Sequence, residues 1–497
     1  MELGSIIEFL EGKTIFVTGA TGFLAKIFVE KILRVQPNVK KLYLLVRAED
    51  IESATQRMHD EIIGKDLFRL LKKNLGPKFN SFLSEKLAAI PGDISQENLN
   101  LKNFISKEEI YNQLDVIINV AGATKFDERY DVALGTNTLG VKHILDFAKR
   151  CIKLKVLVHL STARHIMSQI YLCGERGGLI VENPHNLGVS LNGVLGLDID
   201  MERKVIEDSL NQLQEKEATK EEIKVAMKDL GIKRANKYGW PNTYVFTKAM
   251  GEMLLWHMKG DMPLSIIRPT MITSTYKEPF PGWIEGARTI DGITVAYGKG
   301  KLRFFLASPE GVIDMIPADL VVNAMIVVLV AHANQPKHII YHVGSSISNP
   351  IKYRSLPDYG YRYFKAKPWI DLHGKPVKVC KGIMLDSMVS FRRFMFLRYQ
   401  LPLKVVELVN AVLCQYFRGL CDDLNKKIHL VMRLAELYKP YVFLDAVFDN
   451  MNTMKLLSAA REGDVEMDLF NFDPKIIDWE DYFLNVHLPG IAKYVMK

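Results

Sequence analysis

The sequence predicts an α/β fold, a doubly wound parallel sheet followed by a mainly helical C-terminal domain. Short apolar runs separated by helix-like periodicity support the sheet, because such runs are typical of strands buried on both faces. Five of them occur early in the chain, at residues 13–18, 42–46, 87–90, 116–120 and 156–160. Beyond about residue 355 this alternation fades, and residues 385–460 have mostly helical character.

Length and charge narrow the classes of protein that fit. A chain of 497 residues is long enough for two domains, which we place at 1–370 and 385–497. Residues 199–237 are charged and helix-prone, which favours a solvated helical pair inserted in the first domain over a lid above its binding site. The net charge of +8 suits an anionic ligand or a membrane surface. Nucleic acid is disfavoured, because the basic residues are scattered rather than clustered.

Cysteines and terminal segments give no sign of export. The 5 cysteines are widely spaced, without metal-ligand spacing, so we expect reduced thiols in a reducing compartment and no metal site. The N-terminus resembles neither a secretory signal nor a plastid transit peptide. No uncharged apolar stretch reaches about 18 residues, so a membrane-spanning helix is not expected. These features predict a chain that stays in the cytoplasm or on its membranes.

A glycine loop directly follows the first predicted strand. It reads Thr18-Gly19-Ala20-Thr21-Gly22-Phe23-Leu24-Ala25 and leads into a predicted helix. Gly19 allows a tight turn, Gly22 lets the backbone approach a diphosphate, and Ala25 permits close helix–strand packing. The phosphates would then lie at the helix N-terminus, where free N–H groups and the helix dipole favour anions. The pattern predicts a Rossmann-type dinucleotide-binding domain, with cofactor contacts from Thr18, Gly19, Thr21, Gly22, Phe23 and Leu24.

The end of the second predicted strand distinguishes between cofactors. An acid there binds the ribose 2′-hydroxyl of NAD, whereas a basic residue accommodates the 2′-phosphate of NADP. This chain has Arg47 and no acid before Glu49, so we predict NADPH. Later strand ends are expected to complete the cofactor site, with Asp93 and Ile94 beside the adenine, Ala121 near the cofactor, and Asn137 bracing the site from a helix.

Tyr244 and Lys248 are four residues apart, which places them on one face of a predicted helix. A free phenol is a weak acid at neutral pH, and a neighbouring cation favours its phenolate form. Lys248 would therefore tune Tyr244 and also hold the nicotinamide ribose. Thr162, which follows the fifth predicted strand, would donate a hydrogen bond to the substrate carbonyl oxygen. By itself the spacing also fits a surface Tyr–Lys pair, but the glycine loop favours the catalytic interpretation.

Longer strings resemble the plant-type alcohol-forming fatty acyl-coenzyme A reductases, which are extended short-chain dehydrogenase/reductases with a male-sterility-type C-terminal domain. The strings are residues 13–25 (KTIFVTGATGFLA), 238–253 (YGWPNTYVFTKAMGEM), 267–270 (IRPT), 278–286 (EPFPGWIEG), 438–441 (YKPY) and 473–497. The resemblance implies that NADPH reduces a long-chain fatty acyl-CoA, through an aldehyde, to a primary alcohol for wax or suberin. It adds Pro269 to the cofactor contacts. It also implies peripheral association with the endoplasmic reticulum, for which residues 391–417 offer an interfacial segment or, equally, a helical core.

One stretch departs from that family's pattern. Residues 164–170 (RHIMSQI) separate Ser161-Thr162-Ala163 from Tyr171-Leu172-Cys173-Gly174, and without them the chain would read STAYLCG. The insertion either displaces Thr162 and blocks the acyl channel or is absorbed as a bulge. Two alternatives to the fatty acyl-CoA reductases stay open. An extended reductase acting on a sugar nucleotide, steroid or flavonoid would share the glycine loop and the Tyr244–Lys248 spacing, and the insertion favours a catalytically impaired NADPH-binding homologue.

The chain with residues 164–170 is expected to be less active than a version lacking them, because the insertion lies directly behind Thr162. Turnover of an acyl-CoA with NADPH, followed by chromatography of the alcohol, measures this. Equal turnover of the two forms would contradict the prediction.

Overall fold

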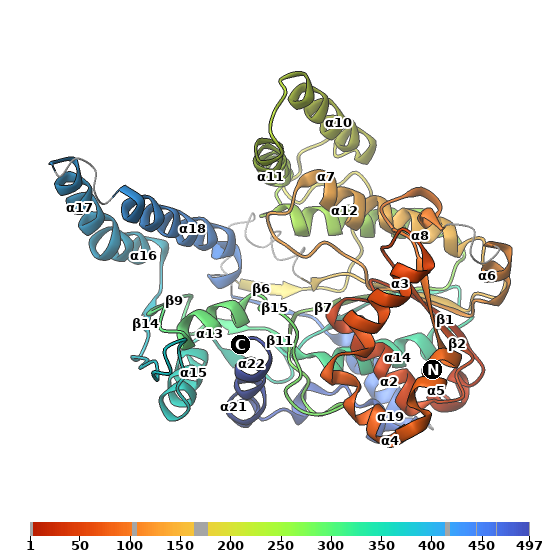
Figure 1. The fold of residues 1–497 in the computed structure, drawn as a ribbon. Helices are drawn as coiled ribbons and strands as arrows, with labels where there is room; N and C mark the ends of the chain where they lie inside the picture. Colours follow the sequence, from red (N-terminus) through yellow and green to blue (C-terminus); the bar gives the residue numbers. More distant parts are fainter. Residues whose placement is uncertain are drawn as a thin grey trace.

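The structure, a computed structural model, describes residues 3–101, 107–163, 177–412, 418–443, 445–463 and 465–496. Its centre is a parallel sheet of seven strands in the order β12-β7-β5-β4-β1-β2-β3 (Figure 1). The strands are β1 (Thr14–Thr18), β2 (Lys41–Val46), β3 (Leu87–Pro91), β4 (Val116–Asn119), β5 (Val156–Leu160), β7 (Leu264–Pro269) and β12 (His338–Val343). The fold class and the five predicted strands are thereby confirmed, with boundaries that agree to within one residue.

The strand order reverses between β1 and β4. Residues Ile15–Thr18 of β1 pair with β4, whereas β2 and β3 extend the sheet on the other side of β1. Thr18 is opposite Asn119, and Asn119 is opposite His159, so the carboxyl ends of β1, β4 and β5 meet at one edge. Ligands of such sheets bind in the crevice outside this edge, at the point of reversal. The topology therefore locates the site before any side chain is considered.

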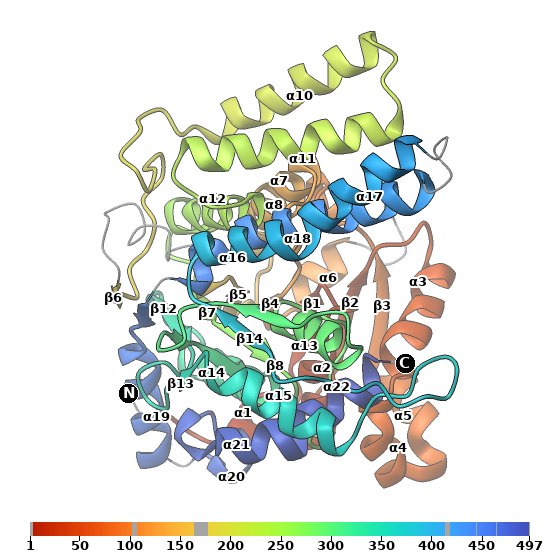
Figure 2. The same cartoon turned by 90° about the vertical axis from the view of Figure 1, so that its left-hand side faces the viewer.

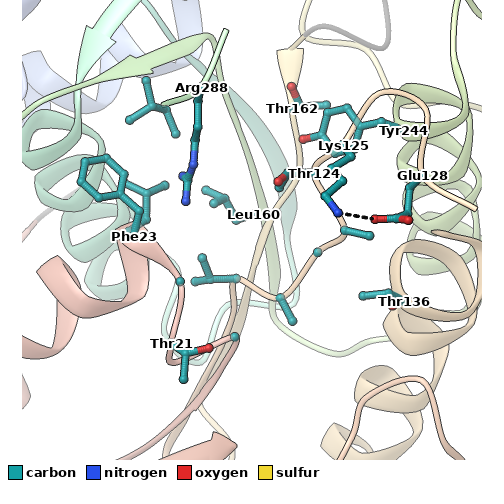
Figure 3. Close-up of a pocket in the computed structure, with 18 of the residues that line it drawn as sticks. Thr21, Phe23, Thr124, Lys125, Glu128, Thr136, Leu160, Thr162, Tyr244 and Arg288 are labelled. Atoms are coloured by element: carbon teal, nitrogen blue, oxygen red, sulfur yellow. Dashed lines mark ion pairs between the residues drawn. The ribbon is translucent and has the colours of Figure 1, made fainter. Parts of the chain in front are cut away.

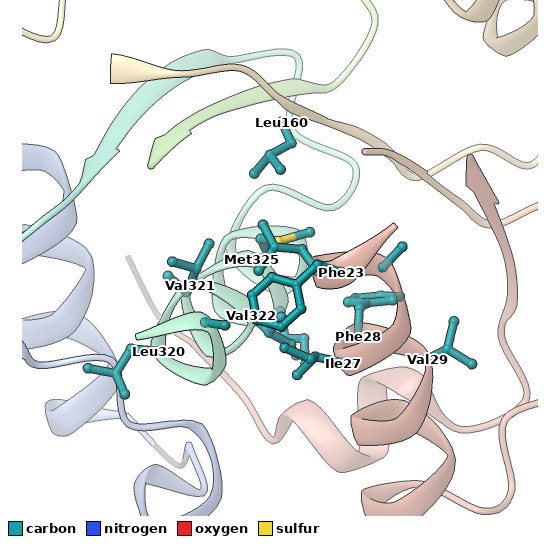
Figure 4. Close-up of a cluster of buried hydrophobic side chains, with 14 of the residues drawn as sticks. Phe23, Ile27, Phe28, Val29, Leu160, Leu320, Val321, Val322 and Met325 are labelled. Carbon is teal, nitrogen blue, oxygen red and sulfur yellow. The ribbon is translucent and has the colours of Figure 1, made fainter. Parts of the chain in front are cut away.

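Helices cover both faces of the sheet. Ile15 and Val17 belong to the core on one face, together with α2 (Phe23–Val35) and α14 (Ala318–Ala331). Figure 4 shows Phe23, Ile27 and Phe28 of α2 facing Val321, Val322 and Met325 of α14, with Leu160 of the sheet above them. Phe16 points to the other core, with α8 (Gly140–Ala148) and the end of α12 (Thr243–Met258). This alternation explains why β1 is buried along its whole length and why its three central residues are all apolar.

The charged segment predicted at 199–237 forms two helices, α10 (Ile199–Glu215) and α11 (Lys220–Lys237), which project from the body (Figure 2). A capping box between Thr219 and Glu222 begins α11. The buried Glu202 anchors the pair, because its carboxylate accepts hydrogen bonds from Arg234 of α11 and from the Tyr130 hydroxyl at 2.7 Å. Glu202 thus ties the beginning of α10 and the end of α11 to the body, and Lys228 in the middle of α11 adds an ion pair with Asp127.

The C-terminal part of the chain divides into an outlying arm and a segment that joins the main core. The arm comprises α16 (Met388–Met395), η7 (Phe396–Gln400), α17 (Leu401–Val412) and α18 (Arg418–Val442), and lies to one side in Figure 1. After it, β15 (Asp445–Phe448) pairs with β6 (Gly177–Ile180), and Trp479 and Tyr482 enter the same core as Val17. None of the helices in the described ranges is both long and apolar enough to cross a membrane.

The remaining elements connect or flank these units. They are α1 (Ile6–Leu10), α3 (Ile51–Met58), η1 (His59–Ile63), η2 (Asp66–Phe68), α4 (Arg69–Leu75), η3 (Gly76–Lys78), α5 (Phe79–Lys86), η4 (Glu97–Asn100), α6 (Lys107–Gln113), α7 (Tyr130–Leu134), η5 (Gly135–Leu139), β8 (Met271–Thr273), α13 (Ile290–Gly298), β9 (Phe304–Leu306), β10 (Val312–Ile313), β11 (Met315–Pro317), β13 (Ile351–Lys352), α15 (Ser355–Ala366), β14 (Ile383–Leu385), α19 (Met451–Glu462), α20 (Met467–Phe470), η8 (Pro474–Ile476), α21 (Trp479–Asp481), η9 (Tyr482–His487) and α22 (Leu488–Tyr494).

Candidate active site

A cavity of about 770 Å³ opens at the carboxyl edge of the sheet (Figure 3). That volume is within the range of roughly 300–1,000 Å³ that is usual for small-molecule sites. Most of the predicted site residues line it, namely Gly19, Thr21, Gly22, Phe23, Leu24, Arg47, Asp93, Ile94, Ala121, Thr162, Tyr244 and Pro269. Thr18, Asn137 and Lys248 do not line it, and their side chains instead support its walls.

The glycine loop forms a close-fitting cradle at one end of the cavity. Gly19 has a φ of 64°, and a Cβ there would lie 2.7 Å from the Cα of Ala121. Gly22 precedes α2 in an extended conformation, and no side chain caps the first turn of the helix. The N–H groups of that turn are therefore the kind of donors that hold phosphate oxygens. Any larger residue at Gly19 would collide with the backbone of Ala121, and this close approach together with the uncapped turn of α2 fits a dinucleotide.

Thr18 and Asn137 hold the two strand ends together behind the cradle. The Thr18 hydroxyl donates to Oδ1 of Asn119 at 2.6 Å and accepts the N–H of Ala121 at 3.3 Å. Asn137, which is fully buried in η5, accepts the N–H of Ala123 at 2.9 Å and donates to the Ala123 carbonyl at 3.0 Å. Both side chains shape the loop after β4, which passes beside the cavity.

Two guanidinium groups lie where β2 ends. Arg47 is exposed and lines the cavity, and within the described parts of the chain it has no ion-pair partner. Arg57, which the sequence analysis missed, also lines the cavity; it donates to the Arg47 carbonyl and forms an ion pair with Glu61 at 2.7 Å. Asp93 accepts the N–H of Ser95 at 2.9 Å, an interaction within its own turn. Arg47 is thus the group at this end whose charge is not already neutralised.

Tyr244 and Lys248 are both on α12 but have different surroundings. Tyr244 lines the cavity, and Figure 3 shows its phenol on the same side as the hydroxyl of Thr162. Lys248 is buried behind that wall, where its Nζ donates to the Leu160 carbonyl at 2.8 Å. Burial lowers the pKa of the Lys248 amine to about 8, although the nearby Glu252 acts in the opposite direction. At neutral pH the amine still carries a positive charge next to the strand that presents Thr162.

An aromatic cluster forms part of the far wall, and the sequence analysis did not foresee it. Phe126 lies in the loop after β4. The centroid of its ring is 6.0 Å from that of Tyr244 and 5.3 Å from that of Tyr438. Tyr438 belongs to α18, which also contributes Leu434 and Leu437 to the lining. The only sequence signal for this cluster was the YKPY string at residues 438–441. No local sequence pattern shows which part of the fold α18 contacts. The C-terminal part of the chain therefore supplies an apolar wall of the cavity.

Residues 164–170 lie outside the described residues, so the proposed effect of the insertion stays a prediction. The described chain reaches Ala163, directly after Thr162, and continues from Gly177 in β6. Thr162 itself is buried and lines the cavity.

The burial of Lys248 predicts a pH-dependent stability. With a pKa of about 8 in the folded chain and about 10.4 when unfolded, the unfolded chain binds more protons between these values. The contribution of this group to the free energy of unfolding therefore rises with pH across that window. Between about pH 7.5 and 9.5 it is expected to rise by about 2 kcal/mol, relative to Lys248→Met. Urea denaturation of both proteins measures the difference, and parallel pH profiles would contradict it.

Comparison with known proteins identifies the family. The model of the male sterility protein family that describes its NAD-binding domain matches residues 17–325, and a second male sterility protein model matches residues 398–497. The alcohol-forming fatty acyl-CoA reductase of Simmondsia chinensis is 55% identical over 497 residues, covering 100% of this chain and 99% of that protein. Fatty acyl-CoA reductase 1 of Arabidopsis thaliana is 49% identical over 494 residues, covering 99% of each.

Solved structures agree on the fold. The reductase domain of a non-ribosomal peptide synthetase from Mycobacterium tuberculosis has a TM-score of 0.54 at 19% identity, covering 98% of this chain and 94% of that one. The terminal reductase domain of the myxalamid pathway has a TM-score of 0.52 at 16% identity, covering 91% and 86%. Taken with the sequence relatives, these findings show that the chain belongs to the plant alcohol-forming fatty acyl-CoA reductase family, whose members are oxidoreductases with a nicotinamide-cofactor domain.

Proposed function

We propose that this chain reduces long-chain fatty acyl-CoA to primary fatty alcohols with NADPH, through an aldehyde. The observation that carries the proposal is the composition of the cavity, in a chain 55% identical to an enzyme named for this reaction. One end is a dinucleotide cradle, the hydroxyls of Thr162 and Tyr244 lie between, and the leucines of α18 form an apolar wall. A substrate with an acyl chain on one side of a reactive carbonyl matches this order of groups.

The choice of NADPH over NADH rests on Arg47. Its guanidinium lines the cavity where β2 ends, and no acid of β2 or of the residue after it competes for a ribose hydroxyl. Arginine presents paired N–H donors that match phosphate oxygens, so the 2′-phosphate of NADPH would replace the missing ion-pair partner. The ratio of dissociation constants for NADPH and NADH measures this preference.

Three residues around the proposed position of the substrate carbonyl have separate roles in the reduction. Two NADPH molecules, bound in turn, would each supply one hydride to the carbonyl carbon: the first, with a proton, would give the aldehyde and release coenzyme A as its thiol, and the second would reduce the aldehyde. Thr162 donates a hydrogen bond to the carbonyl oxygen, where negative charge develops. Tyr244 delivers the proton that completes the alcohol, and the buried Lys248 stabilises the charge that the phenol then carries. The aromatic cluster around Phe126 excludes water from the side that faces α18.

Replacing Tyr244 by Phe is expected to lower the rate of alcohol formation from palmitoyl-CoA and NADPH by a factor of about a hundred or more, because the proton donor is lost. NADPH binding should remain, since the phenol lies outside the glycine cradle. Gas chromatography of the products and fluorescence titration of NADPH measure the two properties. A Tyr244→Phe protein with native turnover would contradict the mechanism. NADPH binding by the native chain without any alcohol would identify an impaired homologue instead.

We further propose that the arm attaches the protein to an anionic membrane surface. In α16, η7 and α17 its exposed apolar side chains are Val389, Phe396, Leu397, Leu401, Val405, Val406, Leu408 and Val409. Four basic residues, Arg392, Arg393, Arg398 and Lys404, are exposed among them, against the single acid Glu407 within α16, η7 and α17. Apolar residues interleaved with basic ones are typical of helices that lie in a bilayer interface. Attachment to the endoplasmic reticulum in particular stays a prediction.

Flotation with phosphatidylcholine vesicles that contain phosphatidylserine tests the arm. The doubly substituted protein Val405→Glu/Leu408→Glu is expected to bind at least about tenfold more weakly, because two apolar anchors become anionic. Leu372→Glu is the matched control, since Leu372 is 97% exposed outside the arm. Unchanged flotation of the doubly substituted protein would contradict the proposal.

A further inference from the structure

The loop of residues 276–288 is fixed to α2 by ion pairs. Lys26 of α2 contacts Glu285 at 2.6 Å, and Lys31 forms an ion pair with Glu278. Arg34, one turn further along α2, approaches Glu278 at 3.2 Å. The side chains of Lys26 and Lys31 are 3% and 2% exposed, so these contacts are buried on the helix side. The loop therefore has a defined position relative to the start of α2.

A second set of contacts fixes the beginning of the same loop. The Asp319 carboxylate, in the first turn of α14, accepts the backbone N–H groups of Tyr276, Lys277 and Glu278 at 2.7, 2.8 and 3.0 Å. Further along, the ring of Trp283 stacks on Phe23, the first residue of α2, with centroids 5.1 Å apart. The loop is thus held both by α14 and by the helix that follows the glycine cradle.

Arg288 follows this loop and extends into the cavity. Its guanidinium carbon lies 5.4 Å from the centroid of the Phe23 ring, and Figure 3 shows the side chain directed into the cavity beside Phe23. Phe23 begins α2, whose first N–H groups face the glycine cradle. A cation at this position adds to the positive end of the helix dipole.

The cations that line the cavity differ in whether a carboxylate already neutralises them. Arg57 forms an ion pair with Glu61, and Lys125 lies 3.7 Å from Glu128. Within the described ranges, no carboxylate lies within ion-pair distance of Arg47 or Arg288. The cavity therefore presents two guanidinium groups with free charge, one where β2 ends and one beside the first turn of α2. Two separate anionic groups of a ligand would satisfy them.

We propose that Arg288 binds a diphosphate group at the rim of the cavity, as a second anion-binding residue beside the glycine cradle. The inference rests on the proposed use of a dinucleotide cofactor and an acyl-CoA, each of which carries a diphosphate. The position over Phe23 favours the diphosphate of the cofactor, because the cradle and the start of α2 receive that group. The ion pairs of Lys26 and Lys31 position Arg288 for this role without contacting the ligand themselves.

Direct titration of the purified chain with NADPH and with NADH, in the absence of acyl substrate, tests the proposal. The substitution Arg288→Gln is expected to raise the dissociation constants of both cofactors by about tenfold or more, because a charge-assisted hydrogen bond is lost. The substitution Arg47→Gln should lower the affinity for NADPH but not for NADH, since NADH has no 2′-phosphate. Arg288→Lys should restore part of the affinity. Arg203→Gln is the matched control, because Arg203 is 54% exposed on α10, outside the residues that line the cavity.

Steady-state kinetics with two acyl substrates distinguishes the diphosphate of the cofactor from that of CoA. If Arg288→Gln binds both cofactors normally but raises the KM for palmitoyl-CoA and not for palmitoyl-N-acetylcysteamine, which lacks a diphosphate, Arg288 binds the diphosphate of CoA. Unchanged cofactor affinities together with unchanged KM values would overturn the proposal. Failure of the proposed function is distinguishable, because the native chain itself would then bind no cofactor or form no alcohol.

Discussion

The candidate site depends on the close approach of α12 to η5. A Cβ on Gly251 would overlap the carbonyl oxygen of Asn137, so only glycine allows the two backbones to meet there. The same contact brings Asn137 within 3.0 Å of the Thr247 hydroxyl and places Lys248 beside the end of β5. Because Tyr244 is one turn earlier on α12, its distance from Thr162 follows from this packing. The proposed catalytic geometry is thus a consequence of backbone contact between a helix and a π-helical turn.

A different interaction fixes the opposite side of the cavity. The amines of Lys26 and Lys31 are buried on α2, and burial lowers the pKa of each while Glu285 and Glu278 act in the opposite direction. Removing either carboxylate would leave a buried amine without a compensating charge, which destabilises the folded chain. These pairs therefore constrain the loop before Arg288 strongly. Ion pairs thus fix the side of the cavity that carries Arg288, whereas backbone packing fixes the side that carries Tyr244 and Thr162.

Local patterns in the sequence were sufficient for the cradle and for five of the seven strands, but not for β7 and β12. The strand β1, Gly19 and Gly22 are contiguous, so their order alone predicted the dinucleotide site, and the comparisons confirm a nicotinamide-cofactor domain. Contacts between distant residues were not accessible in this way. Tyr438 packs near Phe126 although more than 300 residues separate them, and Arg288 reaches Phe23 from a loop that the sequence showed only as a family string. Lys248 was assigned to the helix face of Tyr244, but its burial and its bond to Leu160 depend on the packed sheet.

The segments of chain before and after residues 164–170 are each fixed to the body of the protein. Before it, the Ser161 N–H donates to the Ile267 carbonyl at 2.8 Å, and Ala163 is buried with Ile180, Ala446 and Phe448. After it, β6 pairs with β15, and the Glu182 carboxylate accepts the N–H groups of His342 and Asn452 at 2.7 and 2.8 Å. Ser161 and Ala163, the two neighbours of Thr162, are therefore held by β7 and by the small core around Ala163. An insertion that narrows access of the acyl chain to the cavity would raise the KM for acyl-CoA and leave the affinity for NADPH unchanged, whereas one that displaces Thr162 would lower kcat.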